Sequence, residues 1–126
     1  MDITFDHVSL SAKDPEKMKD FLIKLLNVTS GERPTMSFPG YFLYAGDLAV
    51  IHLFKQADDD TSIEQKAAPN IVHHICFFSN NYQEVITNIS NLNAPYTMKT
   101  RPETGNKQIF VQGPENLLIE IQAKPN

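Results

Sequence analysis

The sequence has little of what several classes of protein need. Cys76 is the only cysteine among 126 residues, so no disulfide can form within the chain, which favours a reducing, cytoplasmic compartment. No apolar run approaches the roughly 20 residues that cross a bilayer. The segment Met1–Thr4 lacks the basic and then apolar pattern of a secretory leader. We therefore expect a cytoplasmic protein with no membrane partner.

Basic charge is also in short supply. The chain has 11 Lys and Arg against 15 Asp and Glu, a formal net charge of -4, which gives no electrostatic footprint for nucleic acid. No glycine-rich phosphate loop or dinucleotide fingerprint appears. The composition is 41% hydrophobic, typical of globular proteins, and 126 residues suffice for one modest core. We expect a single domain that spans residues 1–126 and acts on a small-molecule substrate.

The first half of the chain begins with a strand and a helix. Asp6–Leu10 alternates between polar and apolar residues, which predicts a strand. Asp14 before Pro15 predicts the N-cap and first position of a helix. Apolar residues then recur at helical spacing and predict one buried face: Met18, Phe21, Leu22, Leu25 and Leu26.

The same order of elements returns in the second half. His73–Phe77 predicts a strand and Asn81 a helix cap, and both lie 67 positions after their counterparts (74 − 7 for the histidines, 81 − 14 for the caps). A fixed spacing of this kind indicates a duplicated half-domain. The helical stripe of this half is Val85, Ile86, Ile89 and Leu92.

Strand-like segments follow each helix, at 40–44, 48–54, 96–99, 108–112 and 117–121. The pattern predicts an α+β fold of two tandem βαβββ repeats that form a curved mixed sheet around a metal cleft. Repeat one lies at about 3–54, a polar linker at about 55–70, and repeat two at about 71–122.

Four residues with metal-binding side chains recur within this repeat. His7 and His52 lie 45 positions apart, and His74 and Glu120 lie 46 apart (52 − 7 and 120 − 74). Each half thus has one such side chain on its first strand and one on its last, and two halves packed about a pseudo-twofold axis would bring them together. An ionisable group on an apolar strand face is costly unless it is paired or coordinated. We predict one divalent metal ion bound by all four.

The residue types narrow the choice of ion. Three imidazoles and one carboxylate suit Zn, Ni, Co, Mn or Fe(II) and disfavour Mg or Ca. His73 lies on the opposite strand face from His74, and we interpret it as a hydrogen-bonded core or rim residue. Cys76 lies on a strand predicted to be buried, where a thiol is inert, so nucleophilic catalysis has little support.

The chain resembles a known superfamily. The residues that carry the resemblance are Phe5–Val8, Phe38–Tyr44, Val50–Leu53, His73–Phe77, Gln108–Val111 and Ile119–Ile121. They are similar to the vicinal-oxygen-chelate proteins: glyoxalase I, methylmalonyl-CoA epimerase, extradiol dioxygenases, and fosfomycin and bleomycin resistance proteins. The resemblance is specific for the superfamily and weak for the reaction, because members share a fold and differ in chemistry.

The resemblance implies a ligand set and an assembly. His7, His52, His74 and Glu120 fall on the four metal-ligand positions. Glyoxalase I and the epimerase usually carry Glu or Gln at the position of His52, so a proton shuttle between two carboxylates does not follow for this chain. The resemblance also implies a homodimer, with metal sites built either within one chain or across the subunit interface.

The leading functional hypothesis is a metal-dependent lyase or isomerase of the glyoxalase type. The ion would chelate neighbouring substrate oxygens and stabilise an enediolate. Glu120, displaced from the metal or loosely held, would move the proton as general base. Alternatives are an Fe(II) ring-cleaving oxygenase, a non-catalytic antibiotic-binding resistance protein, and a thiol transferase acting on fosfomycin. We expect Tyr44 and Phe54 to approach the ligand. Arg33, Arg101, Lys107 and Lys99 are candidates for an anion-binding pocket.

Overall fold

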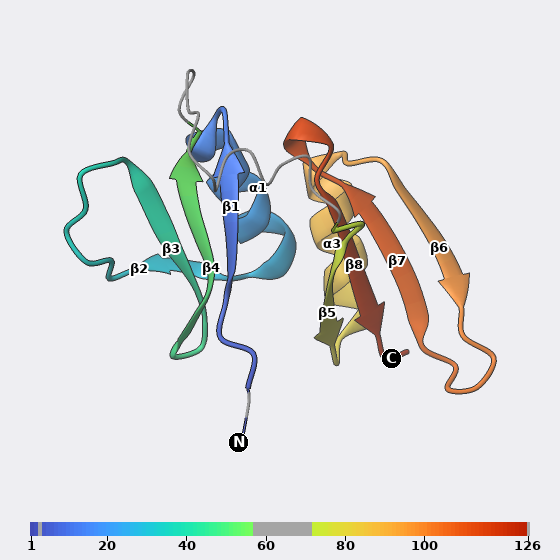
Figure 1. Ribbon diagram of the computed structural model, residues 1–126. Coiled ribbons are helices and arrows are strands. Elements are labelled where there is room, and N and C mark those ends of the chain that lie inside the picture. The colour runs from blue at the N-terminus through green and yellow to red at the C-terminus, as the bar shows by residue number, and fades with distance from the viewer. Residues whose placement is uncertain (3, 57–71, 126) are drawn as a thin grey trace. The chain divides into compact units, whose positions relative to one another are not determined.

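The computed structural model describes residues 1–2, 4–56 and 72–125 of the chain (Figure 1). The chain divides into two compact units, Met1–Asp59 and Asp60–Asn126, and each is described by itself. Most of the predicted linker at 55–70 lies outside the described residues. Among the residues that are described, no helix is long and apolar enough to cross a membrane.

The described residues of the first unit, coloured blue to green in Figure 1, form one helix and four strands. Strand β1 pairs in parallel with β4, and the pairs β4–β3 and β3–β2 are antiparallel, which gives the order β1-β4-β3-β2. The elements are β1 (Val8–Ala12), α1 (Pro15–Leu26), β2 (Thr29–Gly31), β3 (Gly40–Ala45) and β4 (Leu48–Lys55).

The second unit, coloured yellow to red, repeats this topology. Strand β5 pairs in parallel with β8, the remaining pairs are antiparallel, and the order is β5-β8-β7-β6. The elements are β5 (Ile75–Ser79), α3 (Tyr82–Leu92), β6 (Tyr96–Thr100), β7 (Lys107–Gln112), the 3-10 turn η1 (Pro114–Asn116) and β8 (Leu118–Ala123). Two βαβββ modules are therefore confirmed.

Both helices begin at the caps that the sequence predicts. The Asp14 side chain accepts a hydrogen bond from the Lys17 amide at 3.0 Å, and Asn81 accepts one from the Glu84 amide at 3.1 Å. Each side chain satisfies one of the amide groups that a helix start leaves without a partner. Asn27 and Asn93 end the helices in the left-handed conformation, with φ values of 57° and 52°.

Each sheet turns one face toward its core, and we call the opposite face, whose side chains are mostly half-buried, the open face. In β4, Ile51 and Leu53 are 0% and 1% exposed, and His52 between them is half-buried on the opposite face. The helical stripes bury Met18, Phe21, Leu22 and Leu25 in the first unit and Val85 and Ile89 in the second. The residues of interest for chemistry lie on the open faces, which hold His52 and Glu120.

The structure differs from the sequence expectation in several places. The strands form two four-stranded mixed sheets, where we expected one curved sheet. Strand β2 was not predicted, because its three residues, Thr29–Gly31, are all exposed and carry no alternating pattern. The first strands start later than predicted, so His7 and His74 lie immediately before β1 and β5. Strands β4 and β8 each end one residue beyond the predicted repeats, at Lys55 and Ala123.

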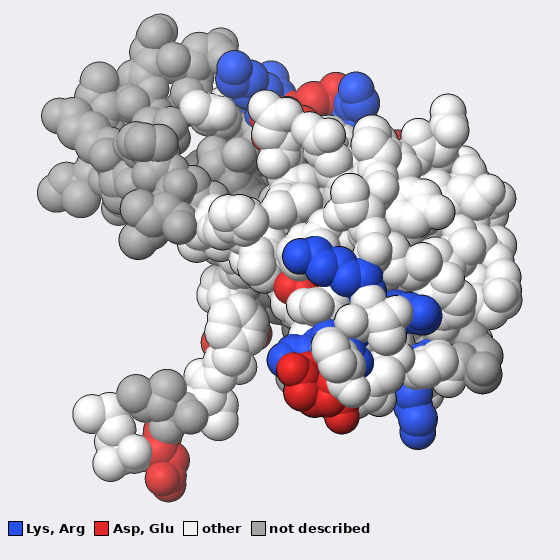
Figure 2. Space-filling model, turned by 90° about the vertical axis from the view of Figure 1, so that its right-hand side faces the viewer, with Lys and Arg blue, Asp and Glu red and all other residues white. Residues whose placement is uncertain are grey.

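Basic and acidic side chains lie near one another on the surface. On the face that Figure 2 shows, the described Lys and Arg side chains stand among Asp, Glu and uncharged ones. Lys107 donates a hydrogen bond to the Thr100 hydroxyl at 2.8 Å, and Arg101 lies 3.7 Å from the Glu103 carboxylate. These basic groups are therefore partly occupied by neighbours on the β6–β7 hairpin.

Candidate metal centre

The two predicted ligands of the first unit lie against one another. The His7 and His52 rings stack with centroids 3.6 Å apart and an angle of 15° between their planes. Phe42 stacks on His52 at 3.7 Å and 8°. Phe42 and His52 are register partners in β3 and β4, so the pairing of the strands places the phenyl ring of Phe42 over the imidazole of His52.

This environment favours the uncharged form of His52. Burial lowers the pKa of His52 below its ordinary value, and the neighbouring His7 lowers it further. A neutral imidazole carries a free lone pair on one ring nitrogen, and this is the form that binds a metal ion. The first unit thus offers nitrogen ligands and no carboxylate from its last strand.

The two predicted ligands of the second unit also meet. His74 Nε2 lies 3.0 Å from Glu120 Oε1. Glu120 is only 5% exposed and is the one buried charged residue among those that the structure describes. A carboxylate in such a place needs polar partners, because its unpaired charge would be costly to bury.

A second partner of Glu120 was missed by the sequence analysis. Gln108 Nε2 donates to Glu120 Oε2 at 3.4 Å, so both carboxylate oxygens face a polar group. The signal was present in the strand pairing: Gln108 shares a face with Phe110, and Phe110 is the register partner of Glu120.

His73 does not lie apart from His74 as predicted. Its Nδ1 is 2.9 Å from the Nδ1 of His74, and the two rings meet edge to face. The expectation that it lies on the opposite strand face was wrong, because both histidines precede β5, where strand parity does not apply. Its interpretation as a hydrogen-bonded rim residue is confirmed, since it is exposed and hydrogen-bonded.

The two pairs occupy equivalent places in their units. In the parallel ladders His52 is the register partner of Ser9, and Glu120 is the register partner of Cys76. Ser9 and Cys76 are both the second residue of their strands, two positions after His7 and His74. Within each unit, the described residues bring together no group of three or more His, Cys, Asp or Glu, and the predicted ligands meet as pairs.

Comparison with known proteins identifies the family. A family model described as the Glyoxalase/Bleomycin resistance protein/Dioxygenase superfamily matches residues 6–111. The chain belongs to this superfamily. Comparison with curated proteins gives no match.

Several solved structures share the fold. FosX, a fosfomycin resistance protein from Listeria monocytogenes, is 19% identical, with a TM-score of 0.69 over 99% of this chain and 96% of that one. A lactoylglutathione lyase from Agrobacterium tumefaciens is 16% identical, with a TM-score of 0.66 over 95% and 92%. An integron cassette protein from V. cholerae is 16% identical, with a TM-score of 0.71 over 99% and 98%. At these identities the likeness shows the fold alone.

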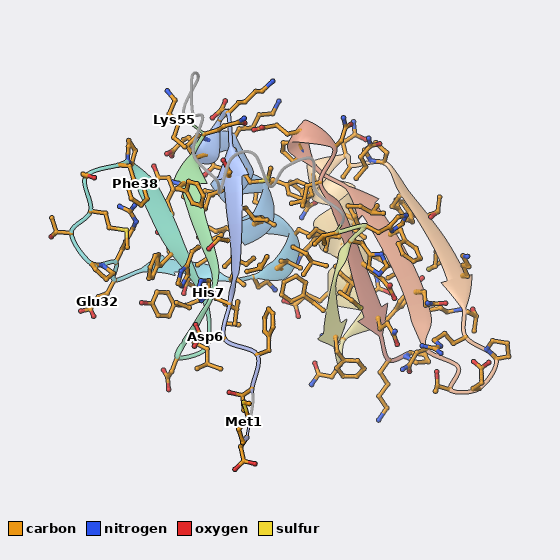
Figure 3. All side chains as sticks on the ribbon, in the orientation of Figure 1. Met1, Asp6, His7, Glu32, Phe38 and Lys55 are labelled. Carbon is orange, nitrogen blue, oxygen red and sulfur yellow. The ribbon has the colours of Figure 1, made fainter. Side chains whose placement is uncertain are left out.

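The aromatic residues expected near a ligand have structural partners in this superfamily member. The Tyr44 hydroxyl donates to the Glu32 carbonyl oxygen at 2.6 Å. Phe54 meets Phe38 edge to face, with ring centroids 5.9 Å apart. Tyr44 and Phe54 therefore also serve to hold the segment between β2 and β3, whose Glu32 and Phe38 are labelled in Figure 3.

Arg33 is held in the same segment. Its Nη2 donates to the Phe38 carbonyl oxygen at 2.9 Å, and its guanidinium lies 5.3 Å from the centre of the Phe38 ring. Its Nε is buried without a hydrogen-bond partner among the described residues. Arg33 lies in the first unit, whereas Lys99, Arg101 and Lys107 lie on the β6–β7 hairpin of the second, so no one unit holds the whole predicted anion pocket.

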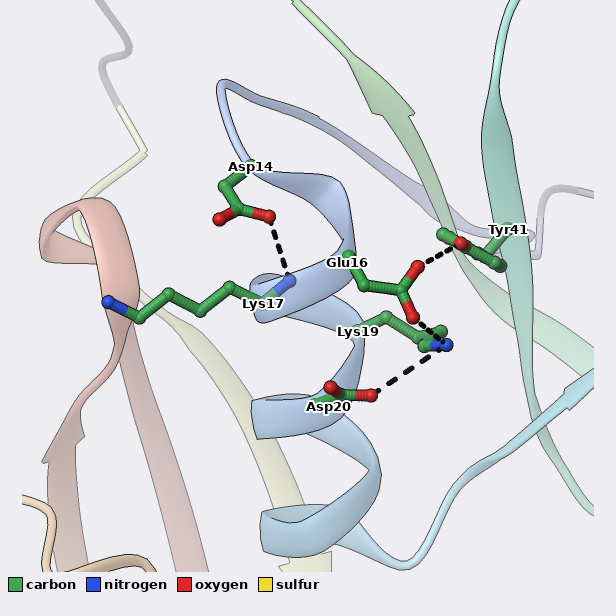
Figure 4. A network of polar contacts seen from close by, with 6 residues as sticks. All are labelled: Asp14, Glu16, Lys17, Lys19, Asp20 and Tyr41. Atoms are coloured by element: carbon green, nitrogen blue, oxygen red, sulfur yellow. Dashed lines mark hydrogen bonds and ion pairs between the residues drawn. The ribbon is translucent and has the colours of Figure 1, made fainter.

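Tyr41 shows which face of the first sheet meets helix α1. Figure 4 shows its hydroxyl donating to Glu16 on α1, where Lys19 binds the same carboxylate at 2.7 Å. Lys19 Nζ also lies 4.6 Å from the centre of the Tyr41 ring. Tyr41 thus faces the helix, and its chain neighbours Gly40 and Phe42 face the open side with His52.

Cys76 is exposed, which corrects the expectation of a buried residue. It extends on the same open face as Glu120, and parity on a half-covered strand places it outside the core. Partial burial of the thiol raises its pKa, and the adjacent Glu120 raises it further. The thiol is thus held in its protonated, weakly nucleophilic form.

Proposed function

We propose that the protein is a divalent-metal-dependent lyase or isomerase of the glyoxalase type, acting on a small substrate with neighbouring oxygens. His7, His52, His74 and Glu120 are the proposed metal ligands, and Glu120 is the proposed general base. The observation that carries the proposal is the pairing within each unit: His7 lies against His52, and His74 lies against Glu120. Superfamily membership supports the same chemistry.

The donor atoms fit a transition-metal ion. The set consists of three imidazoles and one carboxylate, which suits Zn, Ni, Co, Mn or Fe(II). The lowered pKa of His52 favours its neutral form, in which a ring nitrogen has a lone pair for the ion. A bound divalent ion would supply Lewis-acid polarisation of the substrate oxygens.

Glu120 has the surroundings of a proton-transfer group. It is almost fully buried on the open sheet face, with His74 at one oxygen and Gln108 at the other. A base held by two partners is oriented before the substrate arrives, so little reorganisation is needed when the proton moves. In this proposal Glu120 removes the substrate proton and returns it to a neighbouring position.

The same site could serve other chemistry of the superfamily, and the experiments decide between them. An Fe(II) oxygenase or a non-catalytic antibiotic binder remains the alternative, as the superfamily description includes dioxygenases and bleomycin resistance proteins. We also propose a homodimer. Sedimentation at micromolar concentration tests this, and a monomer would rule out metal sites built across a subunit interface.

Metal content tests the ligand assignment. Protein purified without added metal should contain about one divalent ion per chain, and both His7→Ala and His74→Ala should lose it because each removes a primary ligand. Ser11→Ala, on an exposed position of β1, is the matched control and should keep the ion. Unchanged metal content in both histidine variants would show that the assignment of the metal ligands is wrong. A screen of 2-oxoaldehyde thiol adducts then tests the reaction.

A further inference from the structure

Asp6, the residue before His7, contacts the Nδ1 atom of the His7 ring. Asp6 Oδ2 lies 2.6 Å from His7 Nδ1, and both side chains are labelled in Figure 3 next to the start of β1. An ionised carboxylate can only accept hydrogen bonds, so His7 Nδ1 must carry the proton. In a neutral imidazole this leaves Nε2 with the lone pair.

The second unit repeats the contact with a different residue. His73 Nδ1 lies 2.9 Å from His74 Nδ1, while His74 Nε2 faces Glu120 at 3.0 Å. Asp6 and His73 are separated by the same 67 positions as His7 and His74 (73 − 6). In both units, therefore, the preceding residue engages Nδ1, and in the second unit Nε2 is the nitrogen turned toward the other proposed ligand.

We propose that Asp6 and His73 are positioning residues that hold Nδ1 of the following histidine and so present its Nε2 to the divalent ion. The ion itself rests on the proposed function, whereas the hydrogen bonds are tested in metal-free protein. Partners of this kind fix the tautomer and ring orientation of a ligating histidine and raise its basicity.

The two positioning residues differ in how firmly they fix the tautomer of the following histidine. The Asp6 carboxylate is a permanent acceptor, so it holds His7 in one tautomer. The Glu120 carboxylate, 3.0 Å from His74 Nε2, can only accept, so in the metal-free protein His74 carries its proton on Nε2 and its Nδ1 accepts from His73. A neutral His73 can also accept at Nδ1, so the proton of His74 can move to Nδ1 when its Nε2 turns to the ion. Loss of Asp6 should therefore cost more metal affinity than loss of His73. For Asp6→Ala we expect a loss of about 10- to 100-fold, the range found for such partners.

The first test reads the tautomer directly. Nitrogen-15 spectra of metal-free protein at about pH 8.5, two units above the ordinary imidazole pKa of about 6.5, should show the Nδ1–H tautomer at His7. Asp6→Asn keeps a carbonyl oxygen that accepts this hydrogen bond and should preserve the tautomer. Asp6→Ala should shift His7 to a mixture of tautomers. If Asp6→Ala retains the parent tautomer, the positioning role is wrong.

The second test measures divalent-ion affinity by titration of the same variants with Zn²⁺. Asp6→Ala should bind about 10- to 100-fold more weakly, and Asp6→Asn should stay close to the parent. Asp47→Ala, which removes the same charge from the β3–β4 turn, is the control and should bind as the parent does. Equal affinities for Asp6→Ala and Asp47→Ala would overturn the proposal.

The two tests separate this inference from the proposed function. If the parent takes up no divalent ion, the proposed function fails, and presentation of Nε2 to an ion fails with it. The tautomer result then still decides whether Asp6 holds His7. If the parent binds the ion and Asp6→Ala changes neither tautomer nor affinity, the proposed function stands and this inference is overturned.

Discussion

The two units share a topology, a register and a pair of candidate ligands, yet their open faces are built from different chemistry. In the first unit, His52 is stacked between two rings, those of His7 and Phe42. In the second unit, Glu120 is held by His74 and by Gln108. In the proposed function, the first unit would supply nitrogen ligands, and the second would supply the group that moves a proton.

Gln108 accounts for one difference between the open faces of the two units. Gln108 is the register partner of Gln122, and its counterpart in the first unit is Gly40, the partner of Phe54. A Cβ at Gly40 would come 2.3 Å from the Leu53 carbonyl oxygen and 2.9 Å from Arg33 Nη2. The close approach of the backbone leaves room only for glycine, so the first unit cannot place an amide beside its candidate ligand.

The largest effect should come from removing the proton acceptor in the second unit. Glu120→Gln keeps an oxygen donor and a similar shape, but an amide cannot accept a proton at neutral pH. Turnover should fall by about 10²- to 10⁴-fold, the usual contribution of general base catalysis, while ligand affinity and metal content change far less. Steady-state kinetics and a ligand titration measure the two effects. Normal ligand binding with no turnover by the parent on lyase, isomerase or oxygenase substrates would favour a binding protein.

The corresponding position in the first unit should respond differently. His52→Gln restores a residue type common in glyoxalase I and the epimerase, as the resemblance implies, so it should retain metal and activity better than His52→Ala. The alanine variant removes a proposed ligand and leaves a space between the His7 and Phe42 rings. Zn²⁺ affinity and turnover of both variants check this. Equal losses in the two would mean that His52 does not bind the ion.

For stability, the substitution in the first unit should have the larger effect. Gly40→Ala should lower the free energy of unfolding by about 1–3 kcal/mol, because the new methyl group has no space. Gln108→Ala removes one long hydrogen bond and should cost about 1 kcal/mol. Urea unfolding of metal-free protein measures both. A Gly40→Ala variant as stable as the parent would show that the β3–β4 backbone can move apart.

The smallest effect is a pH dependence confined to the first unit. Because burial and His7 lower the pKa of His52 in the folded protein, the unfolded chain binds a proton more readily at this site. Its contribution to stability is present above the unfolded imidazole pKa of about 6.5 and is lost as the pH falls through the lowered folded value. Metal-free parent protein should therefore lose more stability below about pH 6.5 than His52→Gln does. Parallel urea titrations with a chelator present would reveal identical pH profiles if this assignment is wrong.

Much of the fold could be predicted because local signals repeat. Asp14 and Asn81 mark the helix starts, and alternation in Leu48–Phe54 separates the core face from the open one. Strand β2 could not be predicted, because its three residues carry no pattern of their own and pair only through β3. One curved sheet was expected from the repeat, but the strands form two sheets. The pattern of residues within each repeat does not determine whether strands of different repeats pair with one another.

The candidate site was predicted in part. The pairs His7–His52 and His74–Glu120 could be paired from their spacing, since strand position and residue type were both readable. Gln108 and His73 were missed as partners because their roles depend on register and on where a strand begins. Such contacts are set by backbone geometry a residue or two away, which composition and periodicity do not encode.

The central claim is that four side chains from the two repeats bind one divalent ion. A crystal structure of the metal-loaded protein, with anomalous scattering recorded at the absorption edge of the metal, tests it most directly. The account predicts one ion per chain bound by His7, His52, His74 and Glu120 together, with Nε2 of His7 and His74 on the ion. An ion bound by only one of the pairs, or by other residues, would contradict it.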